Sequence, residues 1–304
     1  MSVTLKLKDV TWIGQAFEDT SLLSPFDYIK EEGFTDEDKK RLVGTGVIKE
    51  DGSIEPKQIP LFNTLNLVDR YINIHVYEEM LSMKKSYLYA GPVSIGMIPM
   101  KEELLFQLPS DHSQFSIALK NILGSSKINN LTFEVSLEAK VMKVFALICD
   151  MYREGAIQKQ MEDVTLKTLS FDRDKFDRFA GEDRTNRHRI SKHIDVEVKD
   201  VDECLKQLEE KKLIKLEENL YHVDESVLAF AYRYLLVDKV ITVEIGQLKG
   251  EKVYGSSFKI IQSGSNDVYV LESSTDAYTI ATPSPLEVQA VMNELIEKGP
   301  SLIE

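Results

Sequence analysis

The sequence predicts an α+β fold that is internally duplicated, with two halves arranged around a pseudo-two-fold axis. Each half is expected to combine an antiparallel sheet with a helical bundle. Three pairs of segments carry this prediction, because they match in order and in hydrophobic pattern. The matching pairs are 2–17 with 130–147, 39–54 with 204–223, and 71–123 with 240–296. The strands expected in each half are joined by short turns, which favours antiparallel pairing.

The boundary between the halves is predicted after Ser126, where Gly-Ser-Ser interrupts the periodic pattern. The halves are therefore residues 1–126 and 127–304. The offset between matched segments rises from 128 residues (130 minus 2) to 169 residues (240 minus 71). The second half must therefore hold an insertion, which we place at 155–200, a charged segment with helical character and no counterpart of equal length.

The first half begins with an expected strand at 2–14, where Val3, Leu5 and Leu7 alternate with lysines. Thr35-Asp-Glu-Asp38 has the form of a capping box, which satisfies free backbone N–H groups and predicts that a short helix begins there. The dipeptide Asp51-Gly52 between apolar residues predicts a hairpin, because both residues accept the positive φ that a tight turn requires.

The sheet of the first half is expected to start at 71–77, where apolar and polar residues alternate as in a half-buried strand. Further strands are expected at 85–90, 93–99 and 103–108. A helix is expected to follow Pro109, with Ser110 or Asp111 as its cap and an apolar stripe at helical spacing through 115–123.

The second half is expected to repeat this order. Its predicted strands and helices are a strand at 131–137, a helix at 138–153, a helix and hairpin at 201–223, a helix at 226–237, strands at 239–247, 252–262, 266–272 and 276–281, and a helix at 285–298. The last helix is favoured by Pro285 near its start and Glu287 in its first turn.

Composition limits the class of protein. The hydrophobic fraction of 43% is sufficient for a globular core in 304 residues. There is no apolar run of about 18 residues, so we expect no membrane span, and the N-terminus lacks the continuous apolar stretch of a signal peptide. Two cysteines, Cys149 and Cys204, lie in apolar helical patterns, and reduced thiols fit a cytoplasmic protein.

The sequence contains no pattern that predicts catalysis, a cofactor or a metal. His188 and His193 would lie about 140° apart on a helix, which excludes a shared ligand position on one face. No cysteine–histidine cluster has metal-site spacing. Gly44 and Gly46 lack the third glycine and the preceding strand of a phosphate-binding loop, and are better interpreted as a helix end and a turn. We therefore expect a binding protein that is not an enzyme.

One alternative is a winged-helix regulator of transcription. Residues 201–223 read as a helix followed by a β-ribbon, and the basic segment Arg184–His193 precedes them. The helix itself carries four acidic residues, and the chain has a net charge of −13, which disfavours binding to nucleic acid. A similar helix and hairpin at 36–54 has no basic segment. The interpretation as a repeated structural element is therefore preferred.

The hairpin at 80–86 is the predicted contact for a partner protein. Met80, Leu81 and Met83 would place flexible apolar side chains at a turn. Methionine at an exposed tip adapts to different partners. The alternative is that this turn folds back onto neighbouring helices.

The order of elements resembles the EspG-like chaperones of type VII (ESX) secretion systems. The resemblance lies in the strand at 2–14, the helix and hairpin at 36–54, the sheet and helix at 71–123, and the second copy at 130–298. It is a likeness of architecture and spacing over nearly the whole chain, without a signature motif. The insertion at 155–200 departs from the expected family pattern.

The resemblance implies a cytoplasmic chaperone or adaptor that is not an enzyme and has no cofactor. Such a protein binds helical secretion substrates of the PE/PPE kind, or of the WXG100 or LXG kind in a distant relative, and keeps them soluble for export. An acidic surface keeps such a complex dispersed. No membrane partner is implied, and the sequence predicts no oligomeric state.

Overall fold

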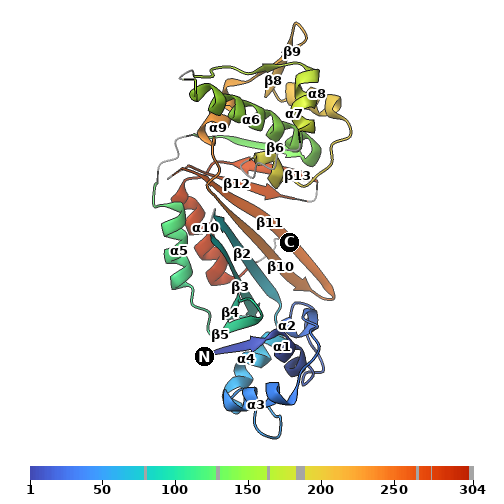
Figure 1. The fold of residues 1–304 in the computed structure, drawn as a ribbon, viewed down its shortest axis with the longest axis vertical. Helices are drawn as coiled ribbons and strands as arrows, with labels where there is room; N and C mark the ends of the chain where they lie inside the picture. Colours follow the sequence, from blue (N-terminus) through green and yellow to red (C-terminus); the bar gives the residue numbers. More distant parts are fainter. Residues whose placement is uncertain are drawn as a thin grey trace.

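The fold is an elongated arrangement of three parts, in which a central sheet with two helices separates two helical modules (Figure 1). The structure is a computed structural model of the chain. It describes residues 1–78, 81–127, 131–162, 165–182, 189–264, 267–274 and 276–300, and for Leu81 and Gln114 the backbone alone.

The first half contributes five strands and five α-helices to the described residues. The strands are β1 (Ser2–Lys6), β2 (Arg70–Glu78), β3 (Leu81–Ala90), β4 (Val93–Pro99) and β5 (Glu103–Gln107). The helices are α1 (Leu7–Gly14), α2 (Pro25–Tyr28), α3 (Asp36–Gly44), the 3₁₀ helix η1 (Pro56–Gln58), α4 (Ile59–Asn66) and α5 (Ser113–Leu123).

The second half follows with the same order and additional short elements. The strands are β6 (Glu134–Glu138), β7 (Ser170–Phe171), β8 (Ile214–Glu217), β9 (Leu220–Val223), β10 (Lys239–Lys249), β11 (Lys252–Ser263), β12 (Asp267–Ser273) and β13 (Ala277–Ala281). The helices are α6 (Ala139–Gln160), α7 (Arg173–Gly181), the 3₁₀ helix η2 (Ile190–His193), α8 (Val201–Glu210), α9 (Glu225–Arg233) and α10 (Pro285–Lys298).

Ten strands of the described residues form one antiparallel sheet in the order β1-β5-β4-β3-β2-β10-β11-β12-β13-β6. From one edge to the centre the order is β1, β5, β4, β3, β2, and from the other edge to the centre it is β6, β13, β12, β11, β10. In each half, the first strand of the chain lies at the edge, and the other four follow in reverse order of sequence. The two sheets expected from the sequence are therefore joined edge to edge, where β2 pairs with β10 from Arg70–Gln247 to Glu78–Lys239. The α+β class and the antiparallel pairing are confirmed, whereas the duplication and the boundary at residue 126 stay predictions.

Helices α5 and α10 cover one face of this sheet. Ile72, Ile74 and Val76 point to that face, as their alternation in the sequence predicts, and each is at most 2% exposed. They pack with Phe115 of α5 and Met292 of α10. Burial of each such side chain contributes about 1.5–3 kcal/mol relative to exposure.

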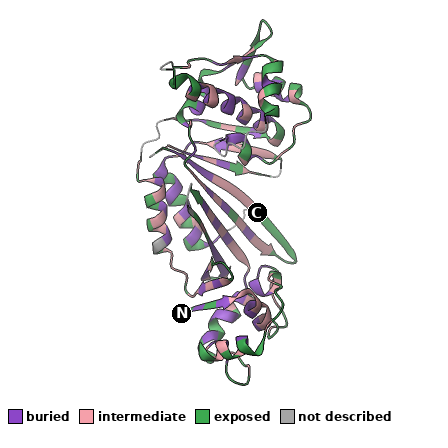
Figure 2. Cartoon of the chain, viewed as in Figure 1, coloured by how far each residue is buried: buried purple, intermediate pink, exposed green. Residues whose placement is uncertain are grey.

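The opposite face carries a helical module at each end. Over one end, α1, α2 and α4 pack on Leu88, Ile95 and Phe106. Over the other end, α6 and α9 pack on Tyr269 and other buried residues of β11–β13. Figure 2 shows the buried residues concentrated in these three layers of contact, while the lower end of the β10–β11 hairpin is exposed.

Several elements differ from the sequence prediction. The strand expected at 2–14 ends at Lys6, because Val10 and Ile13 lie at helical spacing and Asp9 accepts a hydrogen bond from the backbone N–H of Lys6 at 2.7 Å. Helix α6 runs to Gln160, beyond the predicted end at 153. The predicted capping box at Thr35 and the hairpin around Asp51-Gly52 are confirmed, the latter by a bridge between Ile48 and Ile54.

The predicted insertion at 155–200 does not form one helical block. It holds the end of α6, the strand β7, helix α7 and the short η2. β7 pairs with β9 to complete a small sheet in the order β7-β9-β8. The helix after Pro109 begins at Ser113, and its N-cap is His112, so the predicted cap at Ser110 or Asp111 is wrong. Asp111 accepts a hydrogen bond from the backbone N–H of Ser113 at 3.0 Å, just before the helix.

Candidate partner-binding surface

The centre of the sheet presents a polar face between the two helical modules. This face, here called the open face, lies opposite α5 and α10. Because side chains alternate along each strand, the register assigns its residues. They are Asn73, His75, Tyr77, Ser82, Lys84, Thr242, Glu244, Ser257 and Lys259. Most are exposed or half-buried in the structure.

The helical modules bound the open face on two sides. Leu88 at one end and Ile261 at the other belong to the same face of the sheet, and each is buried under its own module. A partner that lies on the open face would therefore contact polar strands in the middle and helical walls at both ends. Such a concave, partly polar surface fits a rod-shaped partner better than a small apolar ligand.

Local hydrogen bonds order the side chains of the open face. His75 Nε2 lies 2.7 Å from Ser82 Oγ, and the His75 ring lies tilted against the ring of Tyr77, with the ring centroids 3.5 Å apart. Tyr77 is 49% exposed. Asn73 Nδ2 donates to Glu244 Oε2 at 3.5 Å. Burial, followed by the charge of Lys84, lowers the pKa of His75, so its ring is neutral at pH 7.

A cavity of about 900 Å³ opens where β2 ends. Tyr77 and Glu78 line it from β2, Ile122 from α5, and His193 from η2. Burial, followed by the charge of Lys259, lowers the pKa of His193 to about 4, so this side chain is also neutral at pH 7. The cavity therefore lies between the central sheet and the second helical module, and the histidine that lines it is uncharged at pH 7.

The segment 189–194, here called the strap, contributes His193 to the lining of this cavity and is held by buried charges. Asp150 of α6 accepts hydrogen bonds from the backbone N–H groups of Ile190 and Ser191 at 2.8 and 2.9 Å. Lys143 Nζ donates to the carbonyl oxygens of Ser191 and Ile194 at 2.7 and 2.8 Å. The strap is therefore fixed to α6.

The strap is also tied to the sheet. Lys259 Nζ, on the open face, donates to the carbonyl oxygen of His193 at 2.8 Å. The sequence analysis did not identify Asp150 or Lys259 as important. The available signal was Asp150 as the single charged residue of the run 144–152, with Arg153 directly after that run, a pattern that indicates a buried ion pair.

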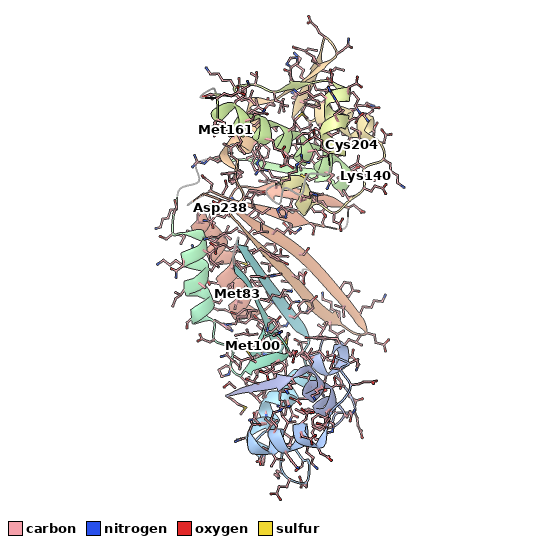
Figure 3. The ribbon with its side chains drawn as sticks, in the orientation of Figure 1. Met83, Met100, Lys140, Met161, Cys204 and Asp238 are labelled. Carbon is pink, nitrogen blue, oxygen red and sulfur yellow. The ribbon has the colours of Figure 1, made fainter. Side chains whose placement is uncertain are left out.

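The predicted contact residues lie along the β2–β3 connection. Met80 lies outside the described residues, and Leu81 begins β3, with only its backbone described. Met83 pairs with Val76 and is therefore on the face covered by α5 and α10, where it packs partly buried against their core (Figure 3). Leu81 and Met83 thus lie within strand β3. Partner binding by these three residues stays a prediction.

The segment proposed for the winged-helix alternative does fold as helices with a β-ribbon. Helix α8 precedes the β8–β9 hairpin, and its exposed side chains include Asp202, Glu203 and Glu210. Arg189 is 4% exposed and donates to Glu154 at 2.7 Å, so it is not presented to a ligand. The charge on the exposed face of α8 opposes that of phosphate.

One polar cluster and two cysteines are further candidates for chemistry. Ser94, Ser110 and His112 form mutual hydrogen bonds at the start of α5, where burial lowers the pKa of His112. Cys149 and Cys204 are buried free thiols. In the part of the chain that the structure describes, no group of three or more histidine, cysteine, aspartate or glutamate residues is placed to hold a metal ion. Within the same residues no helix is long and apolar enough to cross a membrane.

Comparison with known proteins identifies the fold. No family model matches the sequence, and no curated protein matches it. A solved structure of the Mycobacterium tuberculosis type VII secretion system chaperone EspG5, in complex with a PE25–PPE41 dimer, matches the whole chain. The match covers 100% of this chain and 98% of EspG5, with a TM-score of 0.53 and 10% identity. The chain has an EspG-like fold.

The likeness is one of architecture and not of sequence. It extends over both helical modules and the central sheet, since the whole chain is covered. An identity of 10% transfers no individual residue of EspG5 to this chain, so the residues of the open face must be judged by their own geometry.

Proposed function

We propose that the protein is a cytoplasmic chaperone or adaptor, without enzymatic activity, that binds helical substrates of a type VII secretion system and keeps them soluble for export. One observation carries the proposal: the EspG-like fold over the full chain, since EspG5 is a secretion chaperone that has been solved bound to a PE25–PPE41 dimer. The substrate class is helical proteins of the PE/PPE, WXG100 or LXG kind.

The geometry of the open face supports this function. The face is long and bounded by two helical modules, so it can hold the end of a helical hairpin. Its centre is polar, with Asn73, Thr242 and Glu244 able to hydrogen-bond to a partner, and Tyr77 supplies exposed aromatic area. A stable contact of this kind buries about 1,600 Å² in total.

Co-expression with small helical secretion substrates tests the proposal. The protein should co-purify with at least one such substrate as a single peak in size-exclusion chromatography. If every candidate substrate elutes separately from a folded protein, the chaperone function is wrong.

The predicted contact at the β2–β3 connection is tested in that complex. Met83→Asp and Leu81→Asp should each weaken substrate binding, with the far-UV circular dichroism spectrum unchanged. Because Met83 is partly buried against α5 and α10, its unfolding midpoint must be measured alongside the affinity. Unchanged affinity in both variants would remove this connection from the binding surface.

Regulation of transcription through a winged helix is the second candidate, favoured by the β7-β9-β8 sheet beside α7 and α8. This function predicts salt-sensitive retention on DNA, weakened by substitution of Arg187 and Arg189. Arg187 lies outside the described residues, and Arg189 is buried against Glu154, so any loss in an Arg189 variant must be compared with its unfolding midpoint. The acidic exposed face of α8 argues against it. Absence of retention on any promoter DNA at low salt would eliminate it.

A further inference from the structure

Strand β11 extends beyond its neighbour β12 and leaves one edge uncovered. It pairs with β10 over its whole length, from Lys252–Lys249 to Gln262–Lys239. It pairs with β12 only from Ser257 onward, where its partner is Ser273. Among the described residues, Lys252–Ser256 therefore has no strand on its outer side. This segment is called the β11 overhang.

The turn geometry shows which backbone groups point outward. The hairpin closes with a two-residue turn at Gly250 and Glu251, so Lys252 and Lys249 form its hydrogen-bonded closing pair. In an antiparallel ladder such pairs alternate with non-hydrogen-bonded pairs. The N–H and C=O groups of Val253 and Gly255 therefore point away from β10. In agreement, the carbonyl oxygen of Ser257, next in this series, accepts a hydrogen bond from Ser273 Oγ of β12 at 3.1 Å.

The sequence of the overhang is that of a paired strand. Val253 is 46% exposed and Tyr254 is 49% exposed, although β-branched and aromatic residues are typical of strands with neighbours on both sides. Proteins usually protect an exposed edge with proline, a bulge or several charges, and the overhang has only Lys252 at its outer end. Gly255 has no side chain to obstruct the approach of another backbone.

An acidic notch adjoins the overhang where β12 ends. This cavity of about 620 Å³ is lined by Tyr71, Glu244, Glu272 and residues 255–257 and 273–274. The register places Glu244 on the open face, whereas Glu272 pairs with Phe258 and lies on the face of α5 and α10. Carboxylates therefore line the notch from both faces of the sheet: Glu272 on β12, and Glu244 on β10, which β11 separates from the position of an added strand.

We propose that the β11 overhang binds an extended, basic peptide segment of a partner protein as an additional β-strand. The backbone of the guest would pair with Val253 and Gly255, and adjacent lysine or arginine side chains would alternate between faces to reach Glu244 and Glu272. This site lies apart from the contact residues predicted on β3. It does not depend on the proposed export function.

Charge favours this occupant over a second copy of the chain. Two overhangs that paired with each other would bring two acidic notches together on proteins of net charge −13 each, which opposes association. A guest with two adjacent basic residues removes this repulsion. It would also make binding sensitive to salt.

The experiment uses the full chain and a fluorescein-labelled hexapeptide, Thr-Val-Lys-Lys-Val-Thr, in fluorescence anisotropy titrations. The control probe is Thr-Val-Glu-Glu-Val-Thr. The lysine peptide should bind, and the glutamate peptide should not. Val253→Pro removes one outward N–H without removing a bond to β10, and should weaken binding about tenfold, as expected for one backbone hydrogen bond with a favourable geometry.

Val253→Thr is the matched control, because it keeps the N–H and the branched shape, and should bind like the wild type. A second measurement does not depend on the folding of the proline variant: a lysine peptide with N-methylated backbone amides should bind the wild type at least tenfold more weakly. Binding unchanged by both perturbations overturns the proposal. So does failure of the lysine peptide to bind, or light scattering that shows dimers of the chain formed through the overhang.

Discussion

Substitution of Asp150 should destabilise the second helical module strongly. Its side chain is fully buried, at 0% exposure, and accepts a hydrogen bond from Arg153 Nη1 at 2.6 Å as well as those from Ile190 and Ser191. Asp150→Ala leaves the 3%-exposed guanidinium without its counter-charge and two backbone N–H groups without acceptors. Removing one partner of a buried ion pair costs about 3–5 kcal/mol.

Urea denaturation followed by circular dichroism measures this loss as a decrease in the free energy of unfolding. The control is the double variant Asp150→Ala/Arg153→Met, which removes both charges. Because the single variant leaves an uncompensated buried charge, the double variant should be more stable than the single one. A loss below about 1 kcal/mol in Asp150→Ala would mean that the pair is solvated, and the account of the strap would be wrong.

Three further predictions concern pH, packing and acid stability. His193 has a folded-state pKa of about 4, below its unfolded value. The free energy of unfolding should therefore fall by up to about 3 kcal/mol as pH falls from 6.5 to 4. In urea titrations at several pH values, His193→Gln should lack this contribution to the pH dependence. Gly246→Ala would make its Cβ overlap with the ring of Tyr71, which should cost about 1–3 kcal/mol, and Tyr71→Ala should relieve most of that loss in a double-variant comparison. The hydrogen bond from Lys8 lowers the pKa of Asp38, so its contribution is present above the unfolded pKa and lost in acid; the acid-unfolding midpoint of Lys8→Met should therefore lie at higher pH than that of the wild type.

Much of the fold was predictable because local patterns agree with it. The alternation of Ile72, Ile74 and Val76 predicts the strand and its apolar side, which α5 and α10 cover in the structure. The capping box of Ser284 and Glu287 begins α10, and the predicted bounds of this helix are confirmed. In these segments the period of the apolar residues and the end signals point to one structure.

The joining of the two sheets could not be predicted from these patterns. Asn73 and Glu244 are neighbours across β2 and β10 but lie far apart along the chain. An alternating pattern specifies which face of a strand is buried, but it does not specify which strand lies beside it. The strand patterns therefore predict two sheets that meet across a pseudo-two-fold axis, without specifying that β2 pairs with β10.

Residues of the candidate site were predicted less well than the fold. Leu81 and Met83 were interpreted as a turn, because Met-Leu-Ser-Met-Lys-Lys is not strictly alternating, yet β3 begins at Leu81. Pairing with β2 overrides the weak local signal. Lys259 lies in a strand that the sequence predicts. Its hydrogen bond to His193 joins residues more than 60 positions apart in the chain, so the strand pattern does not predict it.

The central claim is that the open face binds a helical partner, and one paired measurement tests it most directly. Thr242→Arg places a bulky charge in the middle of the open face, whereas Ile117→Arg places the same group at a 61%-exposed position of α5, on the other side of the sheet. Isothermal titration with a co-purifying helical substrate should show lost affinity for Thr242→Arg and wild-type affinity for Ile117→Arg. Wild-type affinity in Thr242→Arg, or equal losses in two folded variants, would contradict the account.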